Sequence, residues 1–281
     1  MTAAIAETAY AKINLALHVR RRRADGYHDI ETIFAFADAG DLIDITPGDA
    51  RLSLKGPFAG ALAGDNPDDN LVMRAARRFA AMIDESAPAV MLDKRLPVAA
   101  GIGGGSADAA AMLRLLCRRH DVALDDPRVT TLAHDLGADV PACLASITLR
   151  GDGRGDDLAP VAAKTLAGMP LLLVNPRIAV ATGPVFAAWD GIDRGPLEGG
   201  DPLAAARAGR NDLEPAARRL CPTIGDVLAL LSAQPGVRLA RMSGSGATCF
   251  ALFDSPGRRD AADRTIAAER PGWWRLASRL R

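Results

Sequence analysis

The stretch Pro97-Val98-Ala99-Ala100-Gly101-Ile102-Gly103-Gly104-Gly105-Ser106-Ala107 decides the fold. An apolar, strand-like segment at 90–92 precedes it, and residues 107–119 follow with apolar side chains at helical spacing. Glycines let the backbone approach a ligand closely, and the N–H groups and dipole of a helix N-terminus attract phosphate. We therefore expect a phosphate-binding loop, in which the Ser106 hydroxyl contacts a phosphate oxygen or a bound Mg²⁺.

Two common phosphate-binding motifs do not fit this loop. A Walker A loop needs Gly-Lys-Ser/Thr at its end, which is absent, and the Rossmann fingerprint needs a third glycine where Ser106 stands. The alternative interpretation is a flexible connector in which Ser106 only caps the following helix. The loop by itself predicts a bound phosphate and does not identify the ligand that carries it.

The N-terminal segment 6–19 alternates in the way typical of a β-strand. Apolar residues occupy the odd positions from Ala11 to Val19, so Lys12 and Asn14 lie side by side on the other face. Asp25-Gly26 then predicts a turn.

The rest of the chain mixes strands and helices without regular βαβ alternation, which favours an α+β fold with two lobes. A Gly/Asp-rich stretch at 151–157 predicts an exposed loop and a division into lobes 1–155 and 156–281. The alternating segments predict further strands at 30–36, 41–45, 51–54, 90–92, 171–174, 237–241 and 248–253. Helical periodicity predicts helices from a cap at Asp68 or Asp69 to 84, and at 107–119, 127–136, 183–189, 202–208, 212–220, 222–232 and 258–268. For the tail with Trp273-Trp274, a packed cap and a contact surface are both open.

Composition limits the possible partners and the compartment. The 281 residues have a formal net charge of zero, so no overall field attracts nucleic acid or an anionic membrane, and we expect neither as a partner. No apolar run approaches the ~20 residues that span a bilayer, and no signal peptide is evident.

The four cysteines are far apart, which favours free thiols in a reducing cytoplasm. Since His18, His120 and His134 show no metal-binding spacing, we expect no metal site made of protein side chains. Oligomeric state has no signal in the sequence.

With these motifs in place, the sequence resembles the GHMP kinases, whose central phosphate loop is Pro-x-x-x-Gly-Leu-Gly-Gly-Gly-Ser-Ser. Ile102 stands for the leucine and Ala107 for the second serine, which leaves Ser106 as the only hydroxyl of the stretch. Two further family motifs follow the same order along the chain, Ala11–Leu15 and Met242–Thr248, and the second is a glycine turn that closes over the active site in the family. The resemblance implies a ribosomal-protein-S5-like N-terminal lobe and an α/β-plait C-terminal lobe, with ATP and substrate in the cleft between them. It also implies ATP as phosphoryl donor, with Mg²⁺.

The resemblance is greatest to one branch of these kinases, which phosphorylates the 2-hydroxyl of 4-(cytidine 5′-diphospho)-2-C-methyl-D-erythritol in the non-mevalonate (MEP) route to isoprenoid precursors. It extends from about Tyr10 to Phe253 and is carried by the segments 23–28 (Arg-Ala-Asp-Gly-Tyr-His), 31–34 (Glu-Thr-Ile-Phe), 70–76, 94–97 and 137–141 (Gly-Ala-Asp-Val-Pro). The alternatives are another GHMP kinase, of the homoserine or mevalonate type, and a catalytically silent nucleotide-binding member. The Tyr27-His28 pair argues against the first, because those substrates contain no base.

The resemblance assigns roles to residues in the matching motifs. Asp139 takes or orients the proton of the acceptor hydroxyl, and Lys12 keeps Asp139 ionised and stabilises the transferring phosphoryl group. The alternatives are a surface lysine at a strand end and a turn or cap residue before Pro141. The ATP-binding residues are Pro97, Val98, Ala99, Ala100, Gly101, Ile102, Gly103, Gly104, Gly105, Ser106 and Ala107, with Asn70 and Lys94 on the adenine side. For Asn70 and Lys94, a helix cap and a solvated charge remain open.

The predicted substrate-binding residues are Asn14, Tyr27, His28, Phe34, Thr182 and Phe186. Asn14 would hydrogen-bond the polyol, Tyr27 would stack on cytosine and His28 would bond its edge. Phe34 and Phe186 are the further aromatic residues around the base, and Thr182 is a possible substrate contact. Core packing is the alternative for all four aromatic or imidazole rings.

Overall fold

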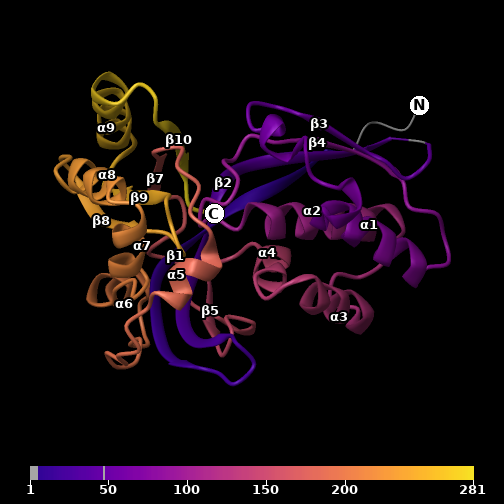
Figure 1. Cartoon of the computed structure of the whole chain (residues 1–281), viewed down its shortest axis with the longest axis horizontal. Helices are drawn as coiled ribbons and strands as arrows, with labels where there is room; N and C mark the ends of the chain where they lie inside the picture. Colours follow the sequence, from indigo (N-terminus) through magenta and orange to yellow (C-terminus); the bar gives the residue numbers. More distant parts are fainter. Residues whose placement is uncertain (1–5, 47) are drawn as a thin grey trace. The chain divides into compact units, whose positions relative to one another are not determined.

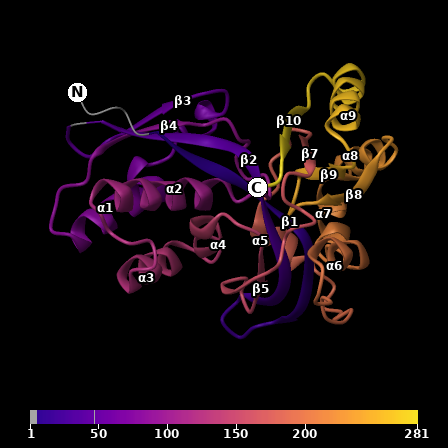
Figure 2. The ribbon, with the colours of Figure 1, turned by 180° about the vertical axis from the view of Figure 1, so that it is seen from behind.

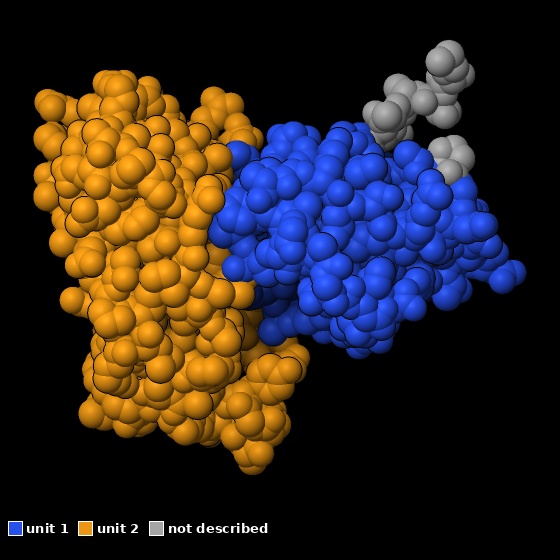
Figure 3. Space-filling model, turned by 45° about the horizontal axis from the view of Figure 1, so that its top comes forward, with its two compact units in different colours: residues 1–11, 39–98, 103–146 blue, residues 12–38, 99–102, 147–281 orange. Residues whose placement is uncertain are grey.

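The computed structural model describes residues 6–46 and 48–281, which group into two compact units. Unit 1 contains residues up to 11 together with 39–98 and 103–146, and unit 2 contains residues 12–38, 99–102 and 147–281 (Figure 3). The long first two strands and the glycine loop contribute residues to both units. The predicted division at residue 155 stays a prediction.

The fold is α+β, and most of the predicted elements occur close to their predicted bounds (Figure 1). The strands are β1 (Glu7–Arg22), β2 (His28–Thr46), β3 (Leu52–Lys55), β4 (Ala89–Asp93), β5 (Leu149–Asp152), β6 (Asp157–Pro160), β7 (Pro170–Asn175), β8 (Val237–Met242), β9 (Cys249–Phe253) and β10 (Trp274–Arg279). The helices are α1 (Leu71–Met82), α2 (Gly104–Arg119), α3 (Pro127–Leu136), α4 (Val140–Ala145), α5 (Thr182–Ala187), α6 (Pro202–Ala208), α7 (Glu214–Leu220), α8 (Thr223–Ser232) and α9 (Pro256–Glu269), with short 3₁₀ turns at Ala59–Leu62 and Pro67–Asp69.

In unit 1, strands β3 and β4 pair in parallel, and β4 pairs antiparallel with the second half of β2, from Leu42 opposite Asp93 to Thr46 opposite Ala89. Helices α1 and α2 lie side by side in both ribbon views (Figures 1 and 2). Phe79 of α1 and Leu113 of α2 are fully buried. Apolar side chains at helical spacing thus give both helices a buried face, as the sequence predicts.

In unit 2, an antiparallel sheet of order β10-β7-β9-β8 has α8 and α9 packed on one side (Figure 1). Its strands bury a continuous apolar core, in which Leu172, Val174 and Phe253 meet Ile224 of α8 and Ile266 of α9. All four cysteines are buried free thiols, as expected.

Three local predictions need correction. Segments 30–36 and 41–45 are parts of one strand, because β2 continues through the Asp-Ala-Gly interruption while paired with β1. Residues 151–157 are not an open loop but join the antiparallel hairpin of β5 and β6. Helix α1 begins after Asn70, not after Asp68 or Asp69, since the Asn70 side chain accepts the Val72 N–H at 3.0 Å. The C-terminal tail, for which the sequence predicts no element, is a strand, with Trp274–Arg279 paired to β7.

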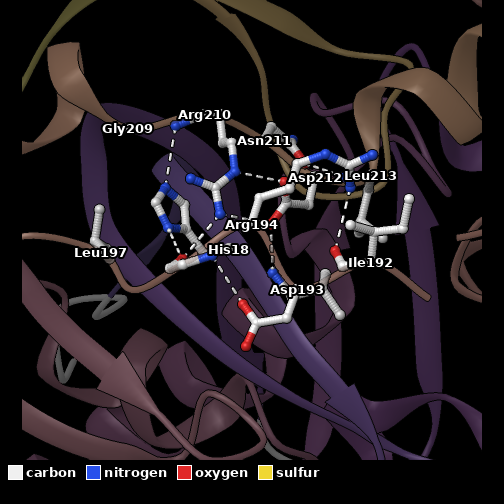
Figure 4. A network of polar contacts seen from close by, with 12 residues as sticks. His18, Ile192, Asp193, Arg194, Leu197, Gly209, Arg210, Asn211, Asp212 and Leu213 are labelled. Atoms are coloured by element: carbon white, nitrogen blue, oxygen red, sulfur yellow. Dashed lines mark hydrogen bonds and ion pairs between the residues drawn. The ribbon is translucent and has the colours of Figure 1, made fainter. Parts of the chain in front are cut away.

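The buried side chain of His18 anchors the second half of β1, which belongs to unit 2 (Figure 4). His18 Nε2 accepts the Arg210 N–H at 3.2 Å, so the ring proton is on Nδ1, which lies 3.2 Å from the Gly195 carbonyl oxygen. The Asp212 carboxylate accepts the Val19 N–H at 2.8 Å and the Arg210 Nε–H at 2.7 Å. This network holds the segments around residues 195 and 211 against the strand that carries Lys12 and Asn14.

The network predicts that the stability of the protein falls in mild acid. Burial, and then the charge of Arg210, lower the pKa of His18 below its usual 6.5, although the hydrogen bond to the Gly195 backbone and the charges of Asp212 and Glu31 oppose the shift. Because the unfolded chain then takes up the proton more readily, stability falls as the pH drops through the unfolded pKa of 6.5. Between about pH 7.5 and about pH 5.5 the melting temperature should fall less in His18→Gln, whose amide also donates and accepts, than in the wild type.

Differential scanning fluorimetry across this pH range measures the effect. His134→Gln, at an exposed position, is the control and should retain the full wild-type decrease. An equal decrease in His18→Gln and wild type would contradict the assignment.

Candidate phosphate and substrate site

The first half of the glycine loop is held by β1 and by the second glycine turn, all within unit 2. The Ile102 carbonyl accepts the Lys12 N–H at 3.1 Å, and the Ala100 carbonyl accepts the Thr248 N–H at 3.1 Å. The Ser243 hydroxyl donates to the Gly101 carbonyl at 2.9 Å. Gly101 has φ +73°, and a Cβ on it would lie 2.4 Å from the Ser243 carbonyl oxygen, so only glycine fits this contact. Within unit 2, Lys12, residues 100–102 and residues 243–248, one part of each of the three motifs, are therefore joined by hydrogen bonds.

The second half of the loop starts α2 in unit 1. Gly103 is the N-cap with φ +64°, makes no side-chain cap, and accepts the Ala107 N–H at 2.8 Å. The N–H groups of Gly104, Gly105 and Ser106 lie in the first turn, where an α-helix offers them no acceptor of its own. The interpretation of Ser106 as the helix cap is wrong, and the positive end of α2 has the groups that an anion site needs.

Lys12 and Asn14 lie on one face of β1, as the alternation predicts. Lys12 is 4% exposed, so the surface-lysine interpretation is wrong. Its Nζ lies 3.4 Å from Asn14 Oδ1 and 4.7 Å from the centre of the Phe34 ring. Asn14 donates to the Thr32 hydroxyl at 2.8 Å, which fixes the orientation of its amide. The amide positions the lysine ammonium group, and a direct contact of Asn14 with substrate stays a prediction.

Asp139 occupies the N-cap position of α4 in unit 1, directly before Val140-Pro141. Its side chain makes no cap hydrogen bond to this helix. Capping therefore does not explain the aspartate at this position, and its catalytic assignment stays a prediction.

Tyr27, His28 and Phe186 come together around the turn after β1 in unit 2. Tyr27 is 53% exposed, so it is not a core residue, and the Arg154 guanidinium lies 5.1 Å from its ring centre. The His28 ring is 5.0 Å from the Phe186 ring and 5.8 Å from the Trp189 ring. Among the described residues, the buried His28 Nε2 atom has no hydrogen-bond partner. Because buried polar atoms usually have a partner, this atom is a candidate to hydrogen-bond a ligand. Burial, and then the charge of Arg22, lower the pKa of His28, so the ring is neutral near pH 7.

The remaining candidate residues lie in different surroundings. Phe34 is 1% exposed and packs under Lys12, which agrees with the core-packing alternative. The Thr182 hydroxyl lies 3.1 Å from the Ser245 hydroxyl, so it ties α5 to the second glycine turn. Asn70 caps α1, and Lys94 is buried between Asp41 and Asp108 at 2.6 and 2.7 Å. The solvated-charge interpretation of Lys94 is wrong, and nucleotide contacts of Asn70 and Lys94 stay predictions.

Two residues beside His28, Arg22 and Trp189, are not identified by the sequence motifs. Arg22 donates to the carbonyl groups of Ala187 and Trp189 at 2.9 and 2.7 Å, and so holds the end of α5 beside His28. Buried Trp189 Nε1, like His28 Nε2, has no hydrogen-bond partner among the described residues. Trp189 is the last residue of the predicted helix at 183–189. The one signal that could have drawn attention to it is its large aromatic side chain in a chain that has few aromatic residues.

No group of three or more His, Cys, Asp and Glu side chains in the described ranges could hold a metal ion. Likewise, none of the described helices is long and apolar enough to cross a membrane.

Two family models match parts of the chain, and relatives and a solved structure match nearly its whole length. The model of the GHMP kinase N-terminal domain matches residues 70–146, and that of the GHMP kinase C-terminal domain matches residues 197–270. The 4-diphosphocytidyl-2-C-methyl-D-erythritol kinase of Rhizorhabdus wittichii is 71% identical over 98% of this chain and 94% of that protein. The kinase of the same name from Sphingopyxis alaskensis is 55% identical over 100% of both chains.

A crystal structure of 4-(cytidine 5′-diphospho)-2C-methyl-D-erythritol kinase superposes with a TM-score of 0.78 at 33% identity, covering 98% of this chain and 99% of that one. The sequence motifs, the α+β fold with two sheets and these relatives agree. The chain belongs to the GHMP kinases, and within them to the 4-diphosphocytidyl-2-C-methyl-D-erythritol kinase family.

Proposed function

We propose that the protein transfers the γ-phosphate of ATP to the 2-hydroxyl of 4-(cytidine 5′-diphospho)-2-C-methyl-D-erythritol, with Lys12 and Asp139 as catalytic residues. The chain is a kinase of the MEP isoprenoid pathway that acts on this cytidyl substrate, and as a GHMP kinase it uses ATP. The observation that carries the proposal is the hydrogen bond of 3.1 Å between the Lys12 N–H and the Ile102 carbonyl. It ties the strand that bears the buried ammonium group directly to the glycine loop.

In the proposed reaction, the N–H groups at the start of α2 hold the phosphates of ATP. Lys12 stabilises the negative charge on the transferring phosphoryl group, and Asp139 accepts or orients the proton of the attacking hydroxyl. Mg²⁺ bound to ATP supplies further charge neutralisation. The residues fit an ion carried by the nucleotide, since Ser106 is the only hydroxyl of the loop and the described ranges hold no carboxylate cluster for a metal.

The cytosine is proposed to stack on Tyr27, with Phe186 on the neighbouring side and the neutral His28 ring at the base edge. The support is the exposure of Tyr27 and the unpartnered, buried Nε2 atom of His28. Base stacking on aromatic side chains contributes about 1–3 kcal/mol in nucleic-acid complexes. We therefore expect specificity to depend on the base as well as on the polyol.

An acceptor panel tests the proposed specificity. With ATP and Mg²⁺, kcat/KM for the cytidyl substrate should exceed that for homoserine or mevalonate by at least about 10⁴-fold, because a site with unpaired buried polar groups rejects acceptors that cannot pair them. ADP release, measured by a coupled assay, reports each turnover. A preference for either small alcohol would contradict the acceptor assignment, and inactivity with every acceptor would support the silent-member alternative.

A further inference from the structure

Three buried charged side chains in unit 1 have no role in the proposed transfer step. The Lys94 ammonium group lies 2.6 Å from an Asp41 carboxylate oxygen and 2.7 Å from an Asp108 carboxylate oxygen. The three side chains are only 3%, 0% and 3% exposed, respectively. Because buried charges cost free energy unless they are paired, such a cluster in the interior needs an explanation.

Asp41 fixes the chain where it enters the glycine loop. One of its carboxylate oxygens accepts the Arg95 N–H at 2.5 Å and the Leu96 N–H at 2.7 Å, while the other accepts from Lys94. A carboxylate with this many donors is rigidly held. Residues 94–96, directly before Pro97, therefore have a fixed backbone position.

Asp108 lies on the other side of the loop, near the start of α2. Its contact with Lys94 links the helix to the segment at 94–96. The ammonium group also lies against the first helical residue, since a Cβ on Gly104 would be 3.2 Å from Lys94 Nζ. Lys94 thus joins the chain before the loop to the helix whose first N–H groups face the proposed phosphates.

Neutralising one lysine needs only one carboxylate, yet two are present. The second oxygen of Asp108 is buried and has no hydrogen-bond partner among the described residues. Burial raises the pKa of Asp108 to about 7, while Lys94 opposes this shift. The hydrogen bond to Lys94 is therefore the interaction that accounts for this buried carboxylate.

We propose that Asp41, Lys94 and Asp108 form a positioning network that sets the first turn of α2 for binding the phosphates of ATP. The inference rests on the proposed phosphate site at that helix. None of the three side chains need touch the nucleotide, because they act by fixing both ends of the loop. Loosening the network should weaken binding of the phosphates without affecting the acceptor site.

The test variant is Asp108→Asn, whose amide oxygen still accepts from Lys94 and which leaves a balanced Lys94–Asp41 ion pair. Binding of a non-hydrolysable ATP analogue with Mg²⁺ and binding of adenosine are measured by titration calorimetry on the full chain, without acceptor. The Kd for the analogue should rise about tenfold, because a neutral amide holds Lys94 more weakly than a carboxylate does, and the Kd for adenosine should not change. Asp135→Asn, which removes an exposed carboxylate of the same unit, is the control and should leave both values unchanged.

An analogue Kd within about twofold of wild type in folded Asp108→Asn would overturn the proposal. Equal weakening of analogue and adenosine would also overturn it, since that result indicates a general loss of structure. Asp41→Asn provides a second variant with the same two expected readings. Because binding is measured without acceptor, these results are separate from the acceptor panel, which tests the proposed function.

Discussion

Asp139→Asn should lower kcat with the cytidyl substrate by about 10²–10⁴-fold, the range that a positioned proton acceptor contributes. Asparagine retains the size of the side chain and its place before α4, but it cannot accept the hydroxyl proton. Since Asp139 does not cap α4, the substitution removes no cap hydrogen bond of that helix, and the variant should remain folded. Steady-state kinetics with both substrates varied, together with thermal melting, separate the two effects.

Binding of ATP should persist in this variant, because the proposed phosphate contacts come from the start of α2. Asp135→Asn again provides an exposed control, and its kcat should match that of wild type. A kcat for Asp139→Asn within about tenfold of wild type would contradict the assigned role, since a proton acceptor contributes more than that.

Gly101→Ala should reduce activity to less than about 1% of wild type, because small displacements of a catalytic loop cost rates of this order. The new Cβ would lie 2.4 Å from the Ser243 carbonyl oxygen and 2.7 Å from the Gly246 nitrogen and carbonyl oxygen, all backbone atoms. Residue 101 also has φ +73°, where an L-residue is strained by about 1–2 kcal/mol. The loop and the 243–246 turn would have to separate, and Ile102 would lose its place beside Lys12.

Gly257→Ala is the matched control, since a Cβ there meets nothing within 4 Å and the residue lies in the first turn of α9. It should be neutral or stabilise the protein by up to about 1 kcal/mol. Activity assays and thermal melting of both variants test the comparison. Normal activity in Gly101→Ala would mean that the packing of the loop against the second glycine turn does not matter for function.

The sequence predicts what depends on local pattern. Strand alternation places Lys12 beside Asn14, and helical spacing predicts the helix after the glycine loop, although α2 begins at Gly104 and not at the predicted residue 107. The resemblance supplies the roles of the matched motifs, because their spacing alone does not reveal a substrate.

Predictions fail where distant residues decide the outcome. Lys94 has its partners 53 and 14 residues away in the chain, so nothing near it indicates that the charge is buried. Likewise, Gly195 is 177 residues from His18, although both belong to one network. Strand β10 is short and rich in arginine, and it is stabilised by pairing with β7, a non-local contact that periodicity cannot show.

The proton-coupled ³¹P spectrum of the product tests the proposed transfer most directly. In the acceptor, C2 carries the methyl group and no hydrogen, whereas C1 carries two hydrogens and C3 carries one. A phosphate on the 2-hydroxyl therefore gives a monoester resonance without three-bond splitting by a carbinol proton, and this is the predicted result. A triplet from phosphate on the 1-hydroxyl, or a doublet from phosphate on the 3-hydroxyl, would contradict the account.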